Sequence, residues 1–174
     1  MIILIEGPDC SGKSTLCNQI CRAMIDNKMN FVYEHNDKHT MNDNNILGNI
    51  LDEWKRLSKR NYNIIVDRSV ISNHIYQSIF KDGDLVSKEV AIKLMNMIDK
   101  TIIALPEKSK YFKLFTETKT KRHEDYDCMV DVYNKYESLV YGEFEFYLLN
   151  HNKTRIYDMF NNDLYSFVNN IINN

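Results

Sequence analysis

The chain has 174 residues, of which 44% are hydrophobic and 26% are charged, a balance typical of a soluble globular protein with a single core. The formal net charge of −2 disfavours a broad nucleic-acid-binding surface, and no apolar run approaches the roughly 20 residues that cross a bilayer. The four cysteines show no metal-binding spacing, which favours a reducing, intracellular setting. We therefore expect a cytoplasmic protein without a membrane partner, and a polynucleotide partner is disfavoured.

The first feature along the chain is an apolar run at 2–5 that leads into the sequence GPDCSGKS at 7–14. The run predicts a buried parallel strand. The segment after it fits G-x-x-x-x-G-K-[ST], a loop whose backbone N–H groups surround a polyphosphate. A helix predicted from Lys13 to about Asn27 would direct the positive end of its dipole at the same anion. Strand, loop and helix in this order predict that the chain binds the phosphates of a nucleotide.

Individual positions of this loop have expected roles. Gly7 and Gly12 give the backbone the freedom to wrap around an anion. Lys13 would contact the β- and γ-phosphates, and the Ser14 hydroxyl would bind Mg²⁺. ATP and Mg²⁺ are thus the expected cofactors, and the residues expected to bind ATP are Gly7, Cys10, Ser11, Gly12, Lys13, Ser14 and Thr15.

Strands and helices alternate along the rest of the chain. Strands are predicted at 31–33, 62–66, 101–105 and 155–157, and helices at about 43–60, 69–80, 86–97, 108–116, from after 125 to about 149, and 164–172. Alternation of this kind gives right-handed crossovers and a parallel sheet. We expect one α/β domain over 1–174, with the three-layer P-loop NTPase fold: a five-stranded parallel sheet with helices on both faces and a short lid.

Charged residues follow the predicted strands, and ligands of such a sheet lie at the carboxyl ends of its strands. Asp67 directly follows the strand 62–66, where a carboxylate holds Mg²⁺ directly or through water; a helix N-cap is the alternative. Arg68 suits a phosphate, with a surface ion pair as the alternative. We expect both side chains to lie near Asp9 and Lys13.

Two further segments attract attention. The segment at about 118–125 breaks all periodicity and predicts a mobile lid that closes over the phosphates; a solvated basic loop is the alternative. Its cations are Lys119, Lys121 and Arg122. In the helix 69–80, a polar stripe of Ser69, Asn73 and Gln77 lies opposite an apolar stripe of Ile71, Ile75 and Ile79. The two amides can donate and accept hydrogen bonds, as a pyrimidine edge requires.

Together these segments resemble the thymidylate kinase family of P-loop kinases. Residues 6–15, EGPDCSGKST, resemble its signature E-G-x-D-x-[AS]-G-K-[ST]-[ST]. Asp67-Arg68 with Ser72-Asn73 and Tyr76-Gln77 resembles its D-R-[YF]-x-x-S-[SN]-x-A-Y-Q segment, and Tyr157-Asp158 resembles its final strand and D-A pair. The likeness spans most of the chain, and the first two segments are the specific ones.

The resemblance implies roles for the remaining residues. Asp9 would bind the sugar 3′-hydroxyl of an acceptor nucleotide and Arg68 its 5′-phosphate, while Asn73 and Gln77 would face the base. Tyr76 would pack beside the sugar or base, with a core tyrosine as the alternative. Some family members place an arginine where this chain has Cys10, so the lid's Lys121 and Arg122 would supply that charge here. The resemblance also suggests a homodimer through the helices 43–60 and 69–80.

We therefore expect ATP-dependent phosphorylation of a pyrimidine deoxynucleoside monophosphate, either dTMP or a modified dTMP or dUMP analogue. The expected catalytic residues are Lys13, Arg68, Asp9, Lys121 and Arg122. The base stays open, because the family's R-E-P-G-G motif is replaced by Tyr33-Glu34-His35-Asn36. The abundant Asn, Lys, Ile and Tyr are typical of an AT-rich genome, and a viral or phage gene in a host cell fits this pattern.

Other activities remain open. A deoxynucleoside kinase phosphorylates a neutral hydroxyl and needs a general base, and Glu34 stands where related enzymes carry theirs. A kinase of a modified base or of a polynucleotide end is a further variant. A P-loop switch or regulatory ATPase is the alternative from another class; it would hydrolyse ATP slowly without an acceptor and would expose an apolar surface for a partner.

Overall fold

The computed structural model describes residues 1–36, 44–81, 86–118, 126–141 and 149–173. Five parallel strands form one sheet in the order β2-β3-β1-β4-β5. The strands are β1 (Ile2–Glu6), β2 (Phe31–His35), β3 (Asn63–Asp67), β4 (Lys100–Ala104) and β5 (Thr154–Tyr157). The first strand thus lies at the centre, and the phosphate loop leaves from the middle of the carboxyl edge, where ligands of such sheets bind.

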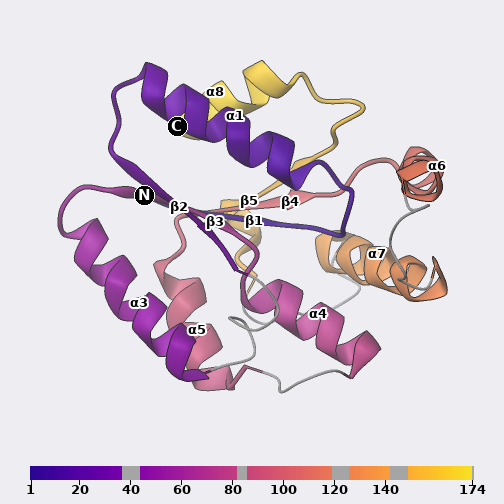
Figure 1. Ribbon diagram of the computed structural model, residues 1–174, viewed down its shortest axis with the longest axis horizontal. Coiled ribbons are helices and arrows are strands. Elements are labelled where there is room, and N and C mark those ends of the chain that lie inside the picture. Colours follow the sequence, from indigo (N-terminus) through magenta and orange to yellow (C-terminus); the bar gives the residue numbers. More distant parts are fainter. Residues whose placement is uncertain (37–43, 82–85, 119–125, 142–148, 174) are drawn as a thin grey trace.

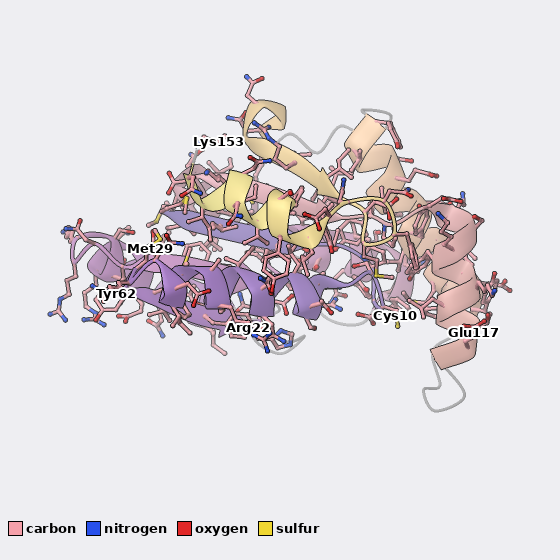
Figure 2. The ribbon with its side chains drawn as sticks, turned by 90° about the horizontal axis from the view of Figure 1, so that it is seen from above. Cys10, Arg22, Met29, Tyr62, Glu117 and Lys153 are labelled. Carbon is pink, nitrogen blue, oxygen red and sulfur yellow. The ribbon has the colours of Figure 1, made fainter. Side chains whose placement is uncertain are left out.

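Helices cover both faces of this sheet (Figure 1). On one face lie α1 (Lys13–Asp26) and α8 (Leu164–Asn173), which run side by side in the view from above (Figure 2). On the other face lie α3 (Asn44–Ser58), α4 (Val70–Phe80), α5 (Lys88–Met97) and α7 (Tyr126–Tyr141). Helix α6 (Lys108–Thr118) adds two buried aromatic rings, Tyr111 and Phe115, to the core of this second face. The three layers confirm the predicted fold class.

Alternation along the strands decides which face each side chain joins. Leu4 and Val66 belong to the core under α3, α4, α5 and α7, whereas Ile5 and Ile65 belong to the core under α1 and α8. Continued to the strand ends, the same alternation sends the two terminal carboxylates in opposite directions: Glu6 of β1 faces α4 and α7, and Asp67 of β3 faces α1.

The structure shifts several predicted boundaries by one or two residues. β3, for example, ends with Asp67 and not before it. β2 continues to His35, beyond the predicted end at 33, because its pairing with β3 runs as far as His35 opposite Asp67. Glu34 and His35 therefore lie in a strand and not in the predicted polar loop. Helix α7 is described as far as Tyr141, and the predicted continuation over 142–148 lies outside the described residues. Two expectations stay predictions: that the chain is a single domain, and that it forms a homodimer.

Candidate active site

The phosphate loop is held in place by close backbone approaches at its two glycines. Gly7 has φ +144°, and a Cβ there would lie 2.3 Å from the carbonyl oxygen of Ala104 in β4. Gly12 has φ +86°, and a Cβ there would lie 2.8 Å from the sulfur of Met159. At Gly7 a Cβ would clash with backbone, and at Gly12 the positive φ strains any other residue although the Met159 side chain could move aside, so glycine is favoured at both positions.

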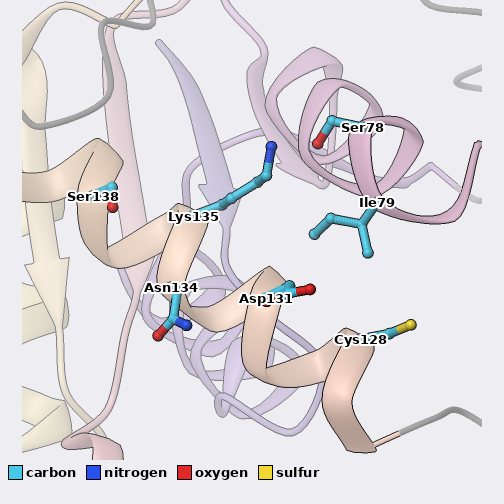
Figure 3. A pocket seen from close by; sticks show the side chains of 7 residues that line it. All are labelled: Ser78, Ile79, Cys128, Asp131, Asn134, Lys135 and Ser138. Atoms are coloured by element: carbon cyan, nitrogen blue, oxygen red, sulfur yellow. The ribbon is translucent and has the colours of Figure 1, made fainter.

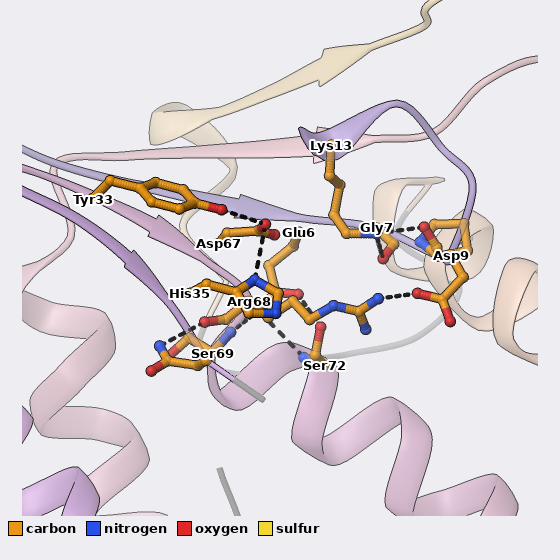
Figure 4. A network of polar contacts seen from close by, with 12 residues as sticks. Glu6, Gly7, Asp9, Lys13, Tyr33, His35, Asp67, Arg68, Ser69 and Ser72 are labelled. Atoms are coloured by element: carbon orange, nitrogen blue, oxygen red, sulfur yellow. Dashed lines mark hydrogen bonds and ion pairs between the residues drawn. The ribbon is translucent and has the colours of Figure 1, made fainter. Parts of the chain in front are cut away.

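Lys13 lies inside this loop and is only 6% exposed. Its ammonium donates hydrogen bonds to the carbonyl oxygens of Gly7 at 2.9 Å and Pro8 at 2.6 Å (Figure 4). Burial, and secondarily the positive charge of Arg68, lower its pKa to about 8. A cation that has lost its water in this way interacts strongly with an anion brought into the loop.

Arg68 reaches the phosphate loop from the turn between β3 and α4. Its backbone takes the left-handed conformation, with φ +73°, and its N–H donates to the carbonyl of Ile5 at 3.0 Å. Its guanidinium pairs with the carboxylate of Asp9 (Figure 4) and lies over the ring of Tyr76 at 5.3 Å from the centroid. Because Asp9 belongs to the loop, two motifs separated by almost 60 residues of sequence meet here.

Asp67, at the end of β3, is 2% exposed. Only one of its two carboxylate oxygens has a hydrogen-bond partner among the described residues. Its Oδ2 accepts a hydrogen bond from the Tyr33 hydroxyl at 3.0 Å and lies 3.1 Å from Nδ1 of His35. Its Oδ1 is buried and has no hydrogen-bond partner among the described residues, and the same holds for Oγ of Ser11 in the phosphate loop. Buried polar atoms of native proteins are nearly always paired, so these two atoms mark a place for a ligand.

These residues fit the Mg²⁺ that the motif implies. A carboxylate oxygen and a hydroxyl are ligands that this ion prefers, and it usually completes its shell with water and with phosphate oxygens of the substrate. Within the described ranges, no three His, Cys, Asp or Glu side chains form a cluster that could hold a metal without such help. The unpaired Oδ1 of Asp67 is one candidate ligand. The hydroxyl that the motif assigns to the ion is that of Ser14, exposed at the start of α1, and not the unpaired Oγ of Ser11.

Glu6, the last residue of β1, also lies at this edge of the sheet, and the sequence assigned it no role. Its side chain is fully buried. Oε1 accepts from the backbone N–H groups of Ser69 at 2.7 Å and Ser72 at 3.3 Å, and Oε2 accepts from the hydroxyls of Ser72 and of Tyr136, the latter at 3.1 Å. Burial raises the pKa of Glu6, although these hydrogen bonds oppose the shift. The sequence feature that could have drawn attention to Glu6 is a charged residue at the end of an otherwise apolar strand.

Four residues that were predicted to contact the acceptor nucleotide lie on the α4 side of the sheet: Glu34, Asn73, Tyr76 and Gln77. Glu34 of β2 accepts at Oε2 from the indole N–H of the buried Trp54 at 2.9 Å, and burial raises its pKa. Asn73 and Gln77 are both buried, and Oδ1 of Asn73 accepts from the backbone N–H of Val86 at 3.0 Å. Tyr76 stacks on Phe80 at a ring separation of 5.9 Å and carries Arg68 on its face. The base-facing roles of the two amides stay predictions.

The remaining predicted site residues are less closely tied to this centre. Cys10 is exposed at the tip of the loop with φ +61°, and Thr15 is exposed in the first turn of α1. The lid cations Lys121 and Arg122 lie outside the described residues.

A cavity of about 380 Å³ lies between α4 and α7 (Figure 3) and is lined by Ser78, Ile79, Cys128, Asp131, Asn134, Lys135 and Ser138. None of the predicted site residues lines it. Among the described residues, no helix is long and apolar enough to span a membrane.

No family model matches the chain. A protein of Acidianus bottle-shaped virus, described as a "Putative thymidylate kinase", is 25% identical over 126 residues, which are 72% of this chain and 76% of that protein.

Two solved structures share the fold. The YorR protein of Bacillus subtilis, in complex with phosphorylated GDP, is similar with a TM-score of 0.71 and 19% identity, over 99% of this chain and 94% of that one. The deoxyadenosine kinase of M. mycoides, with dCMP and dCDP bound, has a TM-score of 0.55 and 16% identity, over 99% of this chain and 97% of that one. The chain therefore has the fold of these nucleotide-binding proteins, and its residues 7–14 fit the phosphate-loop pattern.

Proposed function

We propose that this protein is a kinase that transfers the γ-phosphoryl group of ATP to the 5′-phosphate of a pyrimidine deoxynucleoside monophosphate. The observation that carries the proposal is the meeting of two cations at one edge of the sheet: Lys13 within the phosphate loop and Arg68 paired with Asp9 of the same loop. One cation serves a donor phosphate and the other an acceptor phosphate. The viral relative described as a thymidylate kinase supports a thymidylate-like acceptor.

In this mechanism the protein positions the two phosphates and neutralises their charge, because the acceptor oxygen is already ionised at neutral pH and needs no strong base. Lys13 leaves the carbonyls of Gly7 and Pro8 to contact the β- and γ-phosphates. Arg68 leaves Asp9 to bind the acceptor's 5′-phosphate, and Asp9 then accepts from the sugar 3′-hydroxyl. Lys121 and Arg122 of the lid supply further positive charge during transfer.

Magnesium enters this proposal through Asp67 and Ser14. Asp67 and Ser14 would hold the ion, which would supply positive charge against the charge that develops during phosphoryl transfer. The protein's own contribution is to hold Asp67: Tyr33 and His35 contact Oδ2, which leaves Oδ1 available to the ion. Asn73, Tyr76 and Gln77 of α4 are the proposed contacts for sugar and base.

A specific observation favours a second candidate, a deoxynucleoside kinase. Glu34 is oriented by Trp54, and burial raises its pKa toward the range of a useful general base. Such an enzyme would transfer the phosphoryl group to a 5′-hydroxyl, with Glu34 accepting the proton. The structural likeness to a deoxyadenosine kinase supports this candidate as well.

One screen separates these activities. The wild-type protein is incubated with Mg²⁺ and γ-labelled ATP, together with each deoxynucleoside and each deoxynucleoside monophosphate in turn. A labelled diphosphate from a pyrimidine monophosphate supports the main proposal, and a labelled monophosphate from a nucleoside supports the second candidate. Labelled inorganic phosphate that forms at the same slow rate with every acceptor contradicts both and favours a P-loop switch or ATPase.

A further inference from the structure

Glu6 joins three elements that are distant in the sequence: β1, the first turn of α4 and the middle of α7. The helix α4 begins after Ser69, whose own side chain makes no capping hydrogen bond. The first N–H groups of a helix have no partner within it and are normally bound by a capping side chain nearby. Here Oε1 of Glu6 accepts from the N–H groups of both Ser69 and Ser72 (Figure 4). A residue of the phosphate-loop strand therefore caps α4.

This cap acts directly on the turn that carries Arg68. A left-handed backbone is unfavourable for an arginine and persists only where the surroundings hold it. The Arg68 N–H is bound to Ile5 and its carbonyl accepts from the Asn36 side chain at 2.9 Å. The next peptide N–H, that of Ser69, donates to Glu6. Removing Glu6 would break one of these three hydrogen bonds, which together stabilise the left-handed conformation of Arg68 and place its guanidinium beside Asp9.

The second oxygen of Glu6 belongs to a ring of three hydrogen-bonding oxygens. Oε2 contacts the hydroxyls of Ser72 and Tyr136, and these two hydroxyls lie 2.8 Å from each other. Both hydroxyls donate to Oε2, so the two hydrogens that they carry are used in holding this oxygen. Burial raises the pKa of Glu6, while its hydrogen bonds and the charge of Arg68 oppose the shift. A glutamine would keep Oε1 as the acceptor of the two N–H groups, and its amide would donate to the two hydroxyls, which can also accept.

We propose that Glu6 is a positioning residue that fixes the Arg68 turn and ties it to α7 through hydrogen bonds and not through charge. The inference rests on the proposed function, in which Arg68 binds the acceptor's 5′-phosphate. Lys13 is held by carbonyls of its own loop. Loss of Glu6 should therefore weaken the acceptor site and leave the ATP site nearly unchanged.

The test compares Glu6→Ala and Glu6→Gln by steady-state kinetics, with ATP and the best acceptor of the wild-type screen varied separately. Glu6→Ala should raise KM for the acceptor about tenfold or more and KM for ATP less than about twofold, since small misplacements of a positioning group have large effects. Glu6→Gln should restore both values to within about threefold of the wild type. Equal rises in both KM values, unchanged values, or a Glu6→Gln variant as impaired as Glu6→Ala would overturn the inference.

A second pair of variants decides the matter if Glu6→Ala does not fold. Tyr136→Phe keeps the buried aromatic side chain and removes the hydroxyl that contacts Glu6 and Ser72. It should therefore raise KM for the acceptor alone. Its matched control is Tyr133→Phe in the same helix, whose hydroxyl donates to the carbonyl of Pro106 at 2.7 Å; this variant should change neither KM. Equal behaviour of the two variants overturns the inference. A wild type that phosphorylates no acceptor overturns the proposed function and this inference with it.

Discussion

Glu6 and Asp67 end neighbouring strands, and each is almost completely buried, yet their surroundings differ. On the α4 side, both oxygens of Glu6 accept hydrogen bonds from backbone and hydroxyl groups. On the α1 side, one oxygen of Asp67 is held by Tyr33 and His35, and the other has no hydrogen-bond partner in the described part of the chain. The two sides of one sheet edge thus hold a satisfied carboxyl group and an unsatisfied one.

The difference shows how a buried acid can serve structure or chemistry. Leaving a buried polar atom without a partner costs about 1–3 kcal/mol, and proteins keep such atoms where a ligand supplies the missing contact. The completed network of Glu6 can only preserve geometry, whereas Asp67 can respond to a cation. Substitutions on the Asp67 side should therefore change activity, and substitutions of Glu6 should change positioning and stability.

The largest effect is expected from Lys13→Ala on the α1 side. The loss of a buried cation that contacts the transferred phosphates should lower turnover about 10³-fold, the upper end of what removal of one transition-state contact costs. Circular dichroism should show an unchanged fold. Lys55→Ala, which removes an exposed lysine paired with Asp52 on α3, is the control and should keep full turnover. Near-normal activity of Lys13→Ala would contradict its role.

Asp67→Asn should have the next largest effect. The amide keeps the shape of the side chain, and its oxygen can keep the contacts with Tyr33 and His35; the unpaired oxygen is then replaced by an NH2 group, which cannot bind magnesium. We expect turnover to fall about 100-fold, with no loss in the melting temperature. The measurement is turnover against MgCl₂ concentration alongside a thermal melt. The exposed Asp52→Asn is the matched control, and a melting temperature that falls together with activity would assign Asp67 to structure.

Tyr33→Phe tests the orientation of Asp67. It removes the hydroxyl that donates to Oδ2 and should raise the Mg²⁺ concentration for half-maximal activity about tenfold, as is typical when a residue supporting a metal ligand is lost. Binding of Mn²⁺ to the ATP complex, followed by electron paramagnetic resonance, should weaken in parallel. Tyr165→Phe, at a tyrosine that is 67% exposed, should change neither value. An unchanged metal dependence would mean that His35 alone orients the carboxylate.

The smallest effect is a difference in pH dependence between the wild type and Glu6→Gln. Burial raises the pKa of Glu6 above its ordinary value of 4.5. Between the pKa of the unfolded state and the higher pKa of the folded state, the folded protein therefore binds more protons than the unfolded chain. The free energy of unfolding of the wild type should then fall relative to Glu6→Gln with rising pH. Urea denaturation at about pH 5 and about pH 8 measures this difference. Parallel curves for the two proteins would contradict a raised pKa.

Local patterns in the sequence predicted much of this molecule. The apolar run, the glycines and the Lys-Ser pair predicted β1, the phosphate loop and α1, because each depends on residues close in the chain. The alternation of strands and helices predicted the three layers. The end of β2 was placed too early, because it depends on pairing with a strand some 30 residues away.

Contacts between distant helices were harder to predict. The stripe of Ser69, Asn73 and Gln77 was expected to lie opposite the apolar face of its helix, but all three residues are buried as well. One side of helix α4 contributes Val70, Ile71 and Ile75 to the core beneath the sheet, and another side packs against α7. No periodicity within α4 identifies that second neighbour. The role of Glu6 was missed for the same reason, since its partners Ser72 and Tyr136 are brought to it only by the fold.

The contact between Gly12 and Met159 has a consequence for how the protein is made. The phosphate loop lies at 7–14, yet Ala104 of β4 and Met159 beyond β5 lie so close to it that a Cβ at Gly7 or Gly12 would meet them. A ribosome-bound chain that ends before this methionine carries the whole motif without these neighbours. Nucleotide binding should therefore begin late in synthesis, and its onset would report that the C-terminal part of the sheet has assembled.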